Sequence, residues 1–564
     1  MLIAGRAVQG LAAAVFPLAF GIIRDEFPPE RVSTGIGVIS ATFGIGGGVG
    51  LVVSGVIVDN LHHEWLFWLA LPLILVAIVA TRLWVPESPV RSPARIDWLG
   101  AGLLSGALVT LPLGEPGELV GLGLRPHPRH RLLLRRGRGS PVTSRAMAVD
   151  VTKVTELDVE PGALPKTMAA WVIREETQGE PRDAFQLEEI EVPEPGAFEV
   201  IVRVMAAGVN YNNVWAALGE PVSVMRYGDH PEYDHHIGGS DASGIVWKVG
   251  EGVTRWKPGD EVVIHCNMAS YEDPEVHGLD PLAAPSQMIW GYETTWGSFA
   301  QFTKVQAQQL LTRPQNLTWD EAASYGLVYF TAYRMLITQC RLQAGQRVLI
   351  WGAAGGLGVF ATQICAMAGA HAVGVVSSAD KGELVKQLGA VDYVDRNEFA
   401  GMMRQGGETP DEEKERFKAS RAFSKRVKEI LGDAPDIVFE HVGKATFPTS
   451  VFAVKPFGKV VICAGTTGYD LDFDVRYLWM RQKQIIGSHF ANAYECNKAN
   501  ELIETAQIRP VLWRTLGFDG VPEAHQLMRD NKHLGKIAIL VGAEGEGEGR
   551  TVDGPGAIRA EVGA

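Results

Sequence analysis

The run of small residues WGAAGGLG, at positions 351–358, is the segment whose residue types and spacing point most directly to chemistry. It follows an apolar strand-like segment, VLI, and opens an apolar helical segment, VFATQICAMA. Gly355 allows the backbone to turn, Gly358 allows the helix to approach the sheet, and free N–H groups at the helix start can bind a pyrophosphate. The run therefore predicts a dinucleotide site rather than an ordinary turn. The residues expected to contact the cofactor are Gly352, Ala354, Gly355, Gly356, Leu357 and Gly358.

Residues about twenty positions further on indicate which nucleotide is bound. The second strand ends in VVSS, with Ser377 and Ser378 where enzymes that use NAD usually carry an acid for the ribose hydroxyls. Lys381 follows closely and Arg396 comes after the third strand, so a 2′-phosphate would meet hydroxyl donors and cations. Asp380 is an opposing charge, although aspartate is also common at helix N-termini. The pattern favours NADPH over NADH.

Charge and cysteine content exclude several classes of protein. The formal net charge of −13 over 564 residues opposes attraction to nucleic acid, so no such partner is expected. The five cysteines form no C-x-x-C pair, which argues against a disulfide framework and against a thiolate zinc site. A reducing, cytoplasmic setting is expected for residues 147–564.

Two patterns of apolar residues divide the chain after Met147 and predict an α/β protein. Short strands separated by Pro- and Gly-containing turns predict a β-rich, GroES-like catalytic domain at 147–330, completed by 490–545. Strands that alternate with glycine turns and helices predict a doubly wound parallel sheet, a Rossmann NADPH-binding domain, at 331–489. A charged segment inside this domain is expected to form a solvated helix. Residues 546–564 are expected to be a disordered tail.

The first 113 residues have a different composition. An uncharged run of about 25 residues at 34–58 is long enough to span a bilayer as a helix, and 66–80 and 98–113 are further candidates. Arginine-containing loops alternate with an acidic one, as expected of cytoplasmic and outer loops. The glycine-rich GIGGGVGLVVSG resembles a helix of major facilitator drug exporters. Residues 1–113 are thus interpreted as partial major facilitator-like transmembrane helices.

Transport by this N-terminal piece is not expected, because three or four helices cannot enclose a path that the exporter family builds from two repeated halves. A gene fragment fused upstream is favoured over a working membrane anchor. Residues 114–146, rich in Arg, Gly and Pro and without a packing period, are expected to be a disordered basic linker before a natural start at Met147. Membrane association is expected only if the fragment is part of the native protein.

The order of a β-rich domain, a nucleotide domain and a returning strand, GKIAILVG, resembles the medium-chain dehydrogenase/reductase superfamily over about 380 residues. Zinc-dependent members carry a cysteine and a G-H-E motif as ligands, whereas the corresponding stretches here read GVNYNNVW and GGSDASG. No catalytic zinc is therefore expected. The adjacent pairs His235–His236 and His265–Cys266 do not make a tetrahedral site and are expected to be loop or core residues.

Hydride transfer without a metal requires an activated acceptor, such as an α,β-unsaturated thioester, a quinone or an enone. The segments VNYNNVWAALGEP, IWGYETTWGSFAQF and RYLWMRQKQIIGSHFAN are similar to crotonyl-CoA carboxylase/reductases. This resemblance implies that crotonyl-CoA is reduced with NADPH and that carbon dioxide captures the enolate, giving ethylmalonyl-CoA. It also implies a homo-oligomer, either a dimer or a tetramer.

The same resemblance implies a carbon dioxide pocket made by an asparagine, an aromatic–glutamate pair and a histidine. Matched by motif, these are Asn212, Tyr292, Glu293 and His489, with Tyr292 in place of the family's phenylalanine. The Asn212 amide and a His489 N–H can donate to oxygens that gain charge as the enolate attacks, while Glu293 orients the donors through water. Arg476 and Tyr477 resemble positions lining the family's CoA cleft.

Three alternatives fit the same residues. The first is a non-carboxylating enoyl-CoA or acryloyl-CoA reductase, in which a proton quenches the enolate. The second is a membrane-tethered fusion in which residues 1–113 act as an anchor or transporter. The third is a reductase of quinones or enones that does not depend on the CoA moiety.

Overall fold

The computed structural model describes Arg82 and residues 154–226, 233–278, 280–404 and 406–560. The predicted transmembrane segments and basic linker lie outside these residues, apart from Arg82. Within the described ranges, no helix has the length and apolar character needed to cross a membrane.

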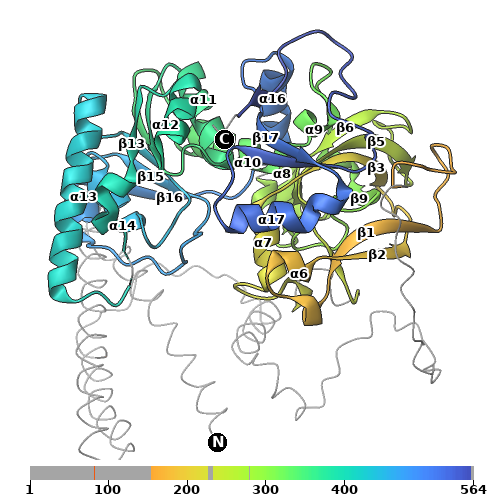
Figure 1. Ribbon diagram of the computed structural model, residues 1–564, viewed down its shortest axis with the longest axis horizontal. Coiled ribbons are helices and arrows are strands. Elements are labelled where there is room, and N and C mark those ends of the chain that lie inside the picture. Colours follow the sequence, from red (N-terminus) through yellow and green to blue (C-terminus); the bar gives the residue numbers. More distant parts are fainter. Residues whose placement is uncertain (1–81, 83–153, 227–232, 279, 405, 561–564) are drawn as a thin grey trace, which may run out of the picture. The chain divides into compact units, whose positions relative to one another are not determined.

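The β-rich domain is built on an antiparallel sheet and a mixed sheet, in which β17 pairs in parallel with both β18 and β19 (Figure 1). One has three strands in the order β2-β1-β4, and the other has eight in the order β10-β6-β5-β3-β18-β17-β19, with β9 also paired to β3. The strands are β1 (Thr167–Ile173), β2 (Gln186–Glu191), β3 (Glu199–Gly208), β4 (His236–Ile237), β5 (Ala242–Val249), β6 (Glu261–Ile264), β9 (Phe302–Gln306), β10 (Leu310–Thr312), β17 (Val511–Leu516), β18 (Lys536–Leu540) and β19 (Ile558–Arg559). A small hairpin joins β7 (Asn267–Met268) to β8 (Met288–Ile289).

The central strand β3 shows why this sheet forms. Its sequence EVIVRVMAAG is apolar almost throughout, and all of its residues after Glu199 are buried, because both faces of the strand are covered. Late residues of the chain pair with it, since β18 runs antiparallel to β3. The prediction that residues 490–545 complete this domain is therefore consistent with the sheet.

The helices of the β-rich domain cover its sheets and reach toward the nucleotide domain (Figure 1). They are α6 (Pro181–Ala184), α7 (Tyr211–Leu218), α8 (Pro274–Gly278), α9 (Trp319–Ala322), α10 (Gly326–Tyr333), α16 (Ala493–Glu504) and α17 (Val521–Arg529).

The nucleotide domain is a six-stranded, wholly parallel sheet in the order β13-β12-β11-β14-β15-β16. Its strands are β11 (Arg347–Ile350), β12 (His371–Val376), β13 (Asp392–Asp395), β14 (Ile437–Glu440), β15 (Lys459–Ile462) and β16 (Gln484–Gly487). Its helices are α11 (Gly356–Met367), α12 (Ala379–Gln387), α13 (Pro410–Leu431), α14 (Phe447–Ala453) and α15 (Arg476–Trp479). The strand order reverses between β11 and β14, which places a ligand crevice at the carboxyl ends of these strands.

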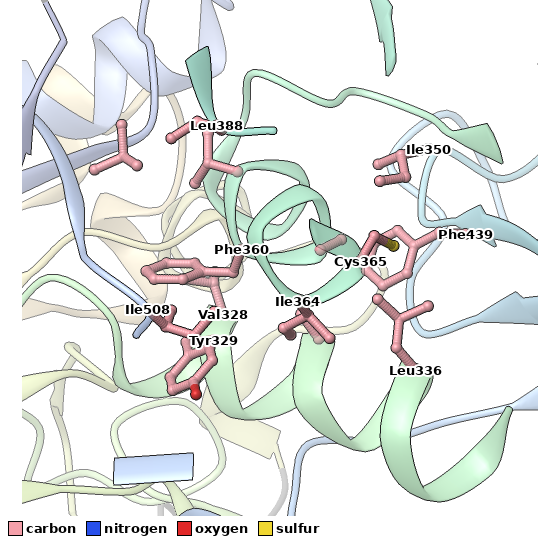
Figure 2. Packing of buried hydrophobic residues seen from close by; sticks show 14 of the residues in the cluster. Val328, Tyr329, Leu336, Ile350, Phe360, Ile364, Cys365, Leu388, Phe439 and Ile508 are labelled. Carbon is pink, nitrogen blue, oxygen red and sulfur yellow. The ribbon is translucent and has the colours of Figure 1, made fainter. Parts of the chain in front are cut away.

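The two domains share a packed core. Figure 2 shows Phe360 and Ile364 of α11 facing Val328 and Tyr329 of α10, and the rings of Tyr329 and Phe360 lie 5.1 Å apart. The predicted domain boundary at 330/331 falls inside α10, which continues into a further helical turn to Gln339. An apolar helix thus runs across the predicted boundary and packs in the core that the two domains share.

The charged segment predicted to be a helix is α13. Thr409 caps it by accepting a hydrogen bond from the Glu412 N–H, and Gly432 ends it with a φ of +78°. The helix is not fully solvated, since Phe423 is buried and stacks on Trp351 at 5.1 Å. Its one apolar stripe faces the sheet while the charged residues face solvent.

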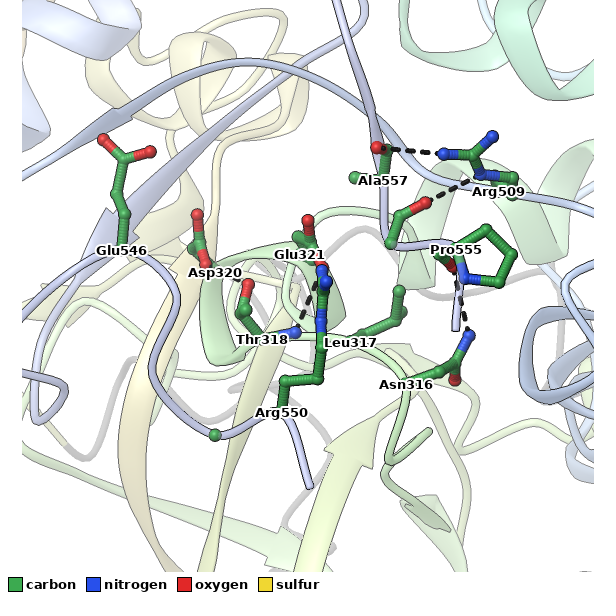
Figure 3. A network of polar contacts seen from close by, with 12 residues as sticks. Asn316, Leu317, Thr318, Asp320, Glu321, Arg509, Glu546, Arg550, Pro555 and Ala557 are labelled. Atoms are coloured by element: carbon green, nitrogen blue, oxygen red, sulfur yellow. Dashed lines mark hydrogen bonds and ion pairs between the residues drawn. The ribbon is translucent and has the colours of Figure 1, made fainter. Parts of the chain in front are cut away.

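The prediction of a disordered tail is wrong for residues 546–560 (Figure 3). β19 extends the eight-stranded sheet by pairing in parallel with β17. Arg550 binds the buried carboxylate of Glu321 at 2.8 Å, and Arg559 binds Asp320 at 3.3 Å. The low apolar content of this segment predicts disorder, but its arginines neutralise two carboxylates in the first turn of α9.

Candidate functional site

A cavity of about 670 Å³ lies between the two domains, and most of the predicted site residues line it. They are Asn212, Tyr292, Glu293, His489, Gly352, Ala354, Gly355, Gly356, Leu357, Ser377, Lys381 and Arg396. Residues of the nucleotide domain therefore meet residues from the early and the late sequence segments of the β-rich domain at one site. This site has the position expected for a ligand crevice in a doubly wound sheet.

The glycine turn has the geometry expected of a pyrophosphate site. Gly355 is the N-cap of α11, so the first N–H groups of the helix point toward the cavity. Gly352 has a φ of +56°, and a Cβ there would lie 2.9 Å from the imidazole of His441. Gly358 does not line the cavity; a Cβ at this position would overlap the Gly352 carbonyl oxygen, so its role is the close approach of helix and turn.

One part of the cavity wall is basic. Lys381 and Arg396 both line it, and in the described part of the chain neither has an acidic partner. Burial and the nearby Arg396 lower the pKa of Lys381. Two unpaired cations that repel each other fit a bound dianion such as a 2′-phosphate. Ser377 lines the same wall, whereas Ser378 is the N-cap of α12 and is not among the lining residues.

His533 joins this basic wall and was not predicted from the sequence. It lines the cavity, and burial together with the charges of Lys381 and Lys536 lowers the pKa of His533 to about 4. Its Nδ1 is buried and has no hydrogen-bond partner among the described residues. A lone histidine before a strand carries no distinctive pattern, so local sequence reasoning had no signal to find it.

The Asn212 side chain is held in a defined orientation. Asn212 is the second residue of α7, and its Nδ2 donates to the Ser240 Oγ at 2.8 Å. Its Oδ1 accepts from the Nδ2 of Asn213 at 2.9 Å. One of the two amide hydrogens of Asn212 is left for a ligand in the cavity.

Glu293 and His489 face the same cavity from different elements. Glu293 lies in the turn after β8, where its Oε2 accepts from the Ile289 N–H at 2.8 Å and burial raises the pKa of its carboxyl group. The imidazole of His489 follows β16. The surrounding protein and the positive charge of Arg334 lower the pKa of His489 to about 4, so near pH 7 the ring is neutral and carries one N–H donor. Tyr292 is buried next to Glu293.

Three family models match parts of this chain. A GroES-like domain of alcohol dehydrogenases matches residues 196–315, a zinc-binding dehydrogenase matches residues 356–505, and the Major Facilitator Superfamily matches residues 1–138. The crotonyl-CoA carboxylase/reductase of Cereibacter sphaeroides is 50% identical over 387 residues, which is 68% of this chain and 89% of that protein. The chain belongs to the crotonyl-CoA carboxylase/reductase family.

Other members of the crotonyl-CoA carboxylase/reductase family agree with this assignment. The crotonyl-CoA reductase of Streptomyces collinus is 42% identical over 383 residues, covering 66% of this chain and 84% of that protein. The structure of the crotonyl-CoA carboxylase/reductase AntE in complex with NADP is 46% identical, with a TM-score of 0.65 over 69% of this chain and 98% of that chain. The resemblance of residues 147–545 to this family is thus confirmed. The transporter resemblance of residues 1–113 is supported by a family-model match alone.

The two stretches that carry zinc ligands in other dehydrogenases read GVNYNNVW and GGSDASG in this chain, without the cysteine and the G-H-E motif. Across the described residues, no group of three or more His, Cys, Asp or Glu side chains is placed to hold a metal ion. His265 is buried, its Nε2 lies 3.1 Å from the Gln308 carbonyl oxygen, and burial lowers the pKa of His265 to about 4. The Cys266 thiol is also buried, which raises its pKa. Both residues pack in the core.

The structure does not bring Arg476 and Tyr477 to the cavity. The Arg476 guanidinium is exposed and pairs at 2.6 Å with Asp474, two residues earlier. The Tyr477 ring packs against Phe417 and Phe452 beside α13. Because one side chain is neutralised locally and the other fills an aromatic cluster, neither lines the cavity.

Proposed function

We propose that this chain catalyses the NADPH-dependent reductive carboxylation of crotonyl-CoA, or of a similar enoyl-CoA, to ethylmalonyl-CoA or the corresponding alkylmalonyl-CoA. The observation that carries the proposal is a single cavity lined both by the glycine turn with its basic wall and by Asn212, Glu293 and His489. A cofactor held on the first set of residues would thus lie beside the second set. The carboxylase/reductase names of relatives up to 50% identical support the same reaction.

The chain's own residues position the hydride transfer. NADPH, when bound, supplies a hydride for the β-carbon of the enoyl thioester, which leaves an enolate whose charge is shared with the thioester carbonyl. The N–H groups at the start of α11 would hold the pyrophosphate, and Lys381 with Arg396 would hold the 2′-phosphate. The Asn212 and Glu293 side chains, which line the same cavity, would then act on the substrate beside the bound cofactor.

Carboxylation then forms one carbon–carbon bond between the enolate α-carbon and carbon dioxide, and no proton is consumed. Negative charge develops on the carbon dioxide oxygens, where the free amide hydrogen of Asn212 and the N–H of neutral His489 can donate. Donors fixed in advance stabilise this charge without reorganising during the reaction. Glu293, already anchored by the Ile289 N–H, holds a water or donor in place.

Protonation of the enolate by water is the competing outcome, and it leads to the non-carboxylating reductase. Apolar side chains wall the cavity near the pocket residues, among them Val209, Ile289 and Leu327. An apolar lining that excludes water slows protonation of the enolate and leaves carbon dioxide as the electrophile.

The deciding experiment incubates the purified full chain with crotonyl-CoA and NADPH, with and without bicarbonate and carbonic anhydrase, and identifies the acyl-CoA products by mass. We expect ethylmalonyl-CoA when bicarbonate is present. Butyryl-CoA as the sole product under saturating bicarbonate would refute the carboxylase proposal. Absence of NADPH oxidation with any enoyl-CoA would refute the reductase step as well.

Asn212→Ala tests the pocket itself. The variant should continue to oxidise NADPH while its product shifts from ethylmalonyl-CoA toward butyryl-CoA, by roughly a hundredfold to a thousandfold in ratio, the usual effect of losing one such donor. Asn497→Ala on α16 is the matched control, because its amide donates to the Ala493 carbonyl oxygen and Asn497 is not among the residues that line the cavity. A product ratio equal to that of the control would count against the assigned pocket.

A further inference from the structure

A buried ion pair between Lys536 and Asp241 stands at the wall of the cavity. The Lys536 Nζ lies 3.0 Å from the Asp241 Oδ2, and each side chain is 1% exposed. Lys536 begins β18 and also lines the cavity, whereas Asp241 directly precedes β5, 295 residues earlier. Burying two charges is costly unless geometry and hydrogen bonds are complete, so a pair at this place points to a need for exact positioning.

Every hydrogen-bonding group of the pair is occupied. The Lys536 Nζ donates to the Val209 carbonyl oxygen at 2.7 Å and to the Asn210 Oδ1 at 2.5 Å, in addition to Asp241. Asp241 also accepts from the Asn210 Nδ2 at 2.8 Å and from the Leu327 N–H at 2.5 Å. An ammonium group has three protons, and all three take part in these hydrogen bonds, so the Lys536 Nζ has no free N–H to offer to a substrate in this arrangement. The arrangement fits a positioning role.

These bonds fix the start of α7, the helix that carries Asn212. Asn210 is the N-cap residue of α7, but its side chain makes no cap hydrogen bond and binds the ion pair instead. The Asn210 side chain thus forms hydrogen bonds with Lys536 and Asp241 in place of the usual capping hydrogen bond to the helix. Ser240, which holds the Asn212 amide at 2.8 Å, is the chain neighbour of Asp241. Both the helix start and the Asn212 side chain thus depend on the pair.

The chain next to Lys536 is hydrogen-bonded to the glycine turn. Gly535 precedes Lys536, and its N–H donates to the Ala354 carbonyl oxygen at 2.9 Å. Gly355 and Gly535 also form an isolated parallel β-bridge. The ion pair therefore connects the residue expected to contact carbon dioxide with the turn expected to bind the cofactor.

We propose that Lys536 and Asp241 are positioning residues that set where Asn212 stands relative to the bound cofactor, and so set how the enolate divides between carbon dioxide and a proton. The inference rests on the proposed carboxylase function. It predicts that disturbing the pair changes the product ratio more than the rate of NADPH oxidation, because hydride transfer does not use Asn212.

The test compares Lys536→Met and Lys536→Arg with Arg313→Met in the purified full chain. Arg313 is a matched control, because it is 0% exposed and paired with Glu261 at 2.6 Å in the same domain but does not line the cavity. We measure the ratio of ethylmalonyl-CoA to butyryl-CoA at saturating bicarbonate, the rate of NADPH oxidation and the melting temperature. Both Lys536 variants should lower the product ratio by about tenfold or more, since a misplacement of about 1 Å can have effects of this size. Arg313→Met should lower the melting temperature and keep the wild-type ratio.

The outcomes separate this inference from the proposed function. If wild type carboxylates and both Lys536 variants keep its product ratio, the inference is overturned while the proposed function stands. If wild type forms no carboxylated product, the proposed function fails and the inference fails with it. Should Lys536→Met not fold, Lys536→Arg decides, because it keeps the buried charge and changes only the geometry of its donors.

Discussion

Replacing Lys381 with alanine should weaken NADPH binding far more than NADH binding. Lys381 and Arg396 line the basic wall of the cavity and, in the part of the chain that the structure describes, have no acidic partner. A hydrogen bond between charged groups contributes about 1.5–3 kcal/mol. At about 1.4 kcal/mol for each factor of ten, loss of one such bond should raise the Kd for NADPH by about 10- to 150-fold. NADH lacks the 2′-phosphate, so its Kd should change by less than about twofold on the same reasoning.

Lys386→Ala is the matched control, since it removes the same charge from the same helix, α12. Its ammonium is 41% exposed and already paired with Glu383 at 3.1 Å. The binding of NADPH and of NADH to each variant is titrated by the change in cofactor fluorescence. The melting temperature of each variant is measured without nucleotide. Without a bound phosphate the two cations repel each other, so Lys381→Ala should melt no lower than wild type. Equal losses for NADPH and NADH, or unchanged NADPH affinity, would refute the basic wall as a phosphate site.

Two further predictions concern stability. A chain that ends at residue 545 lacks Arg550 and Arg559, which neutralise Glu321 and Asp320, so its free energy of unfolding should fall by roughly 3–5 kcal/mol. An unchanged denaturant midpoint would contradict a stabilising role of these two ion pairs. His265 and His525 are buried with pKa values lowered to about 4, below the ordinary value of 6.5. The unfolded chain takes up these protons first, so stability should hold above pH 6.5 and fall by about 3 kcal/mol per histidine as the pH drops from 6.5 to 4. Urea titrations across this range check it, and a flat profile would be inconsistent with neutral buried histidines.

The parts of the fold that the sequence predicts well are those whose determinants lie close together in the chain. Gly355 and Gly358 sit between an apolar strand and an apolar helix, and each has the local role that its spacing indicates. α13 is similar, because its capping box, proline at the first turn and terminal Gly432 all lie within the segment itself. Local chemistry of this kind can be recognised without knowing the rest of the fold.

The parts that escape sequence reasoning depend on partners far away in the chain. Residues 546–560 read as coil because their composition is polar, yet Arg559 finds Asp320 across 239 residues. Lys536 and Asp241 are separated by 295 residues, and neither GKIAI nor GGSDASG indicates that the other exists. The apolar pattern of α10 likewise does not show which distant residues the helix packs against, such as Phe360 and Ile364 of α11.

The geometry implies that this enzyme would control its product by position rather than by acid strength. The Asn212 amide does not release a proton near neutral pH, and neither does the neutral imidazole of His489. The ammonium of Lys536, which reaches the same cavity, is held by three acceptors. In the proposed mechanism, the Asn212 and His489 side chains would therefore stabilise charge on carbon dioxide without giving a proton to the enolate, and the access of water would decide the product. It follows that moving Asn212 through Lys536→Arg should alter the product in the same direction as deleting its amide.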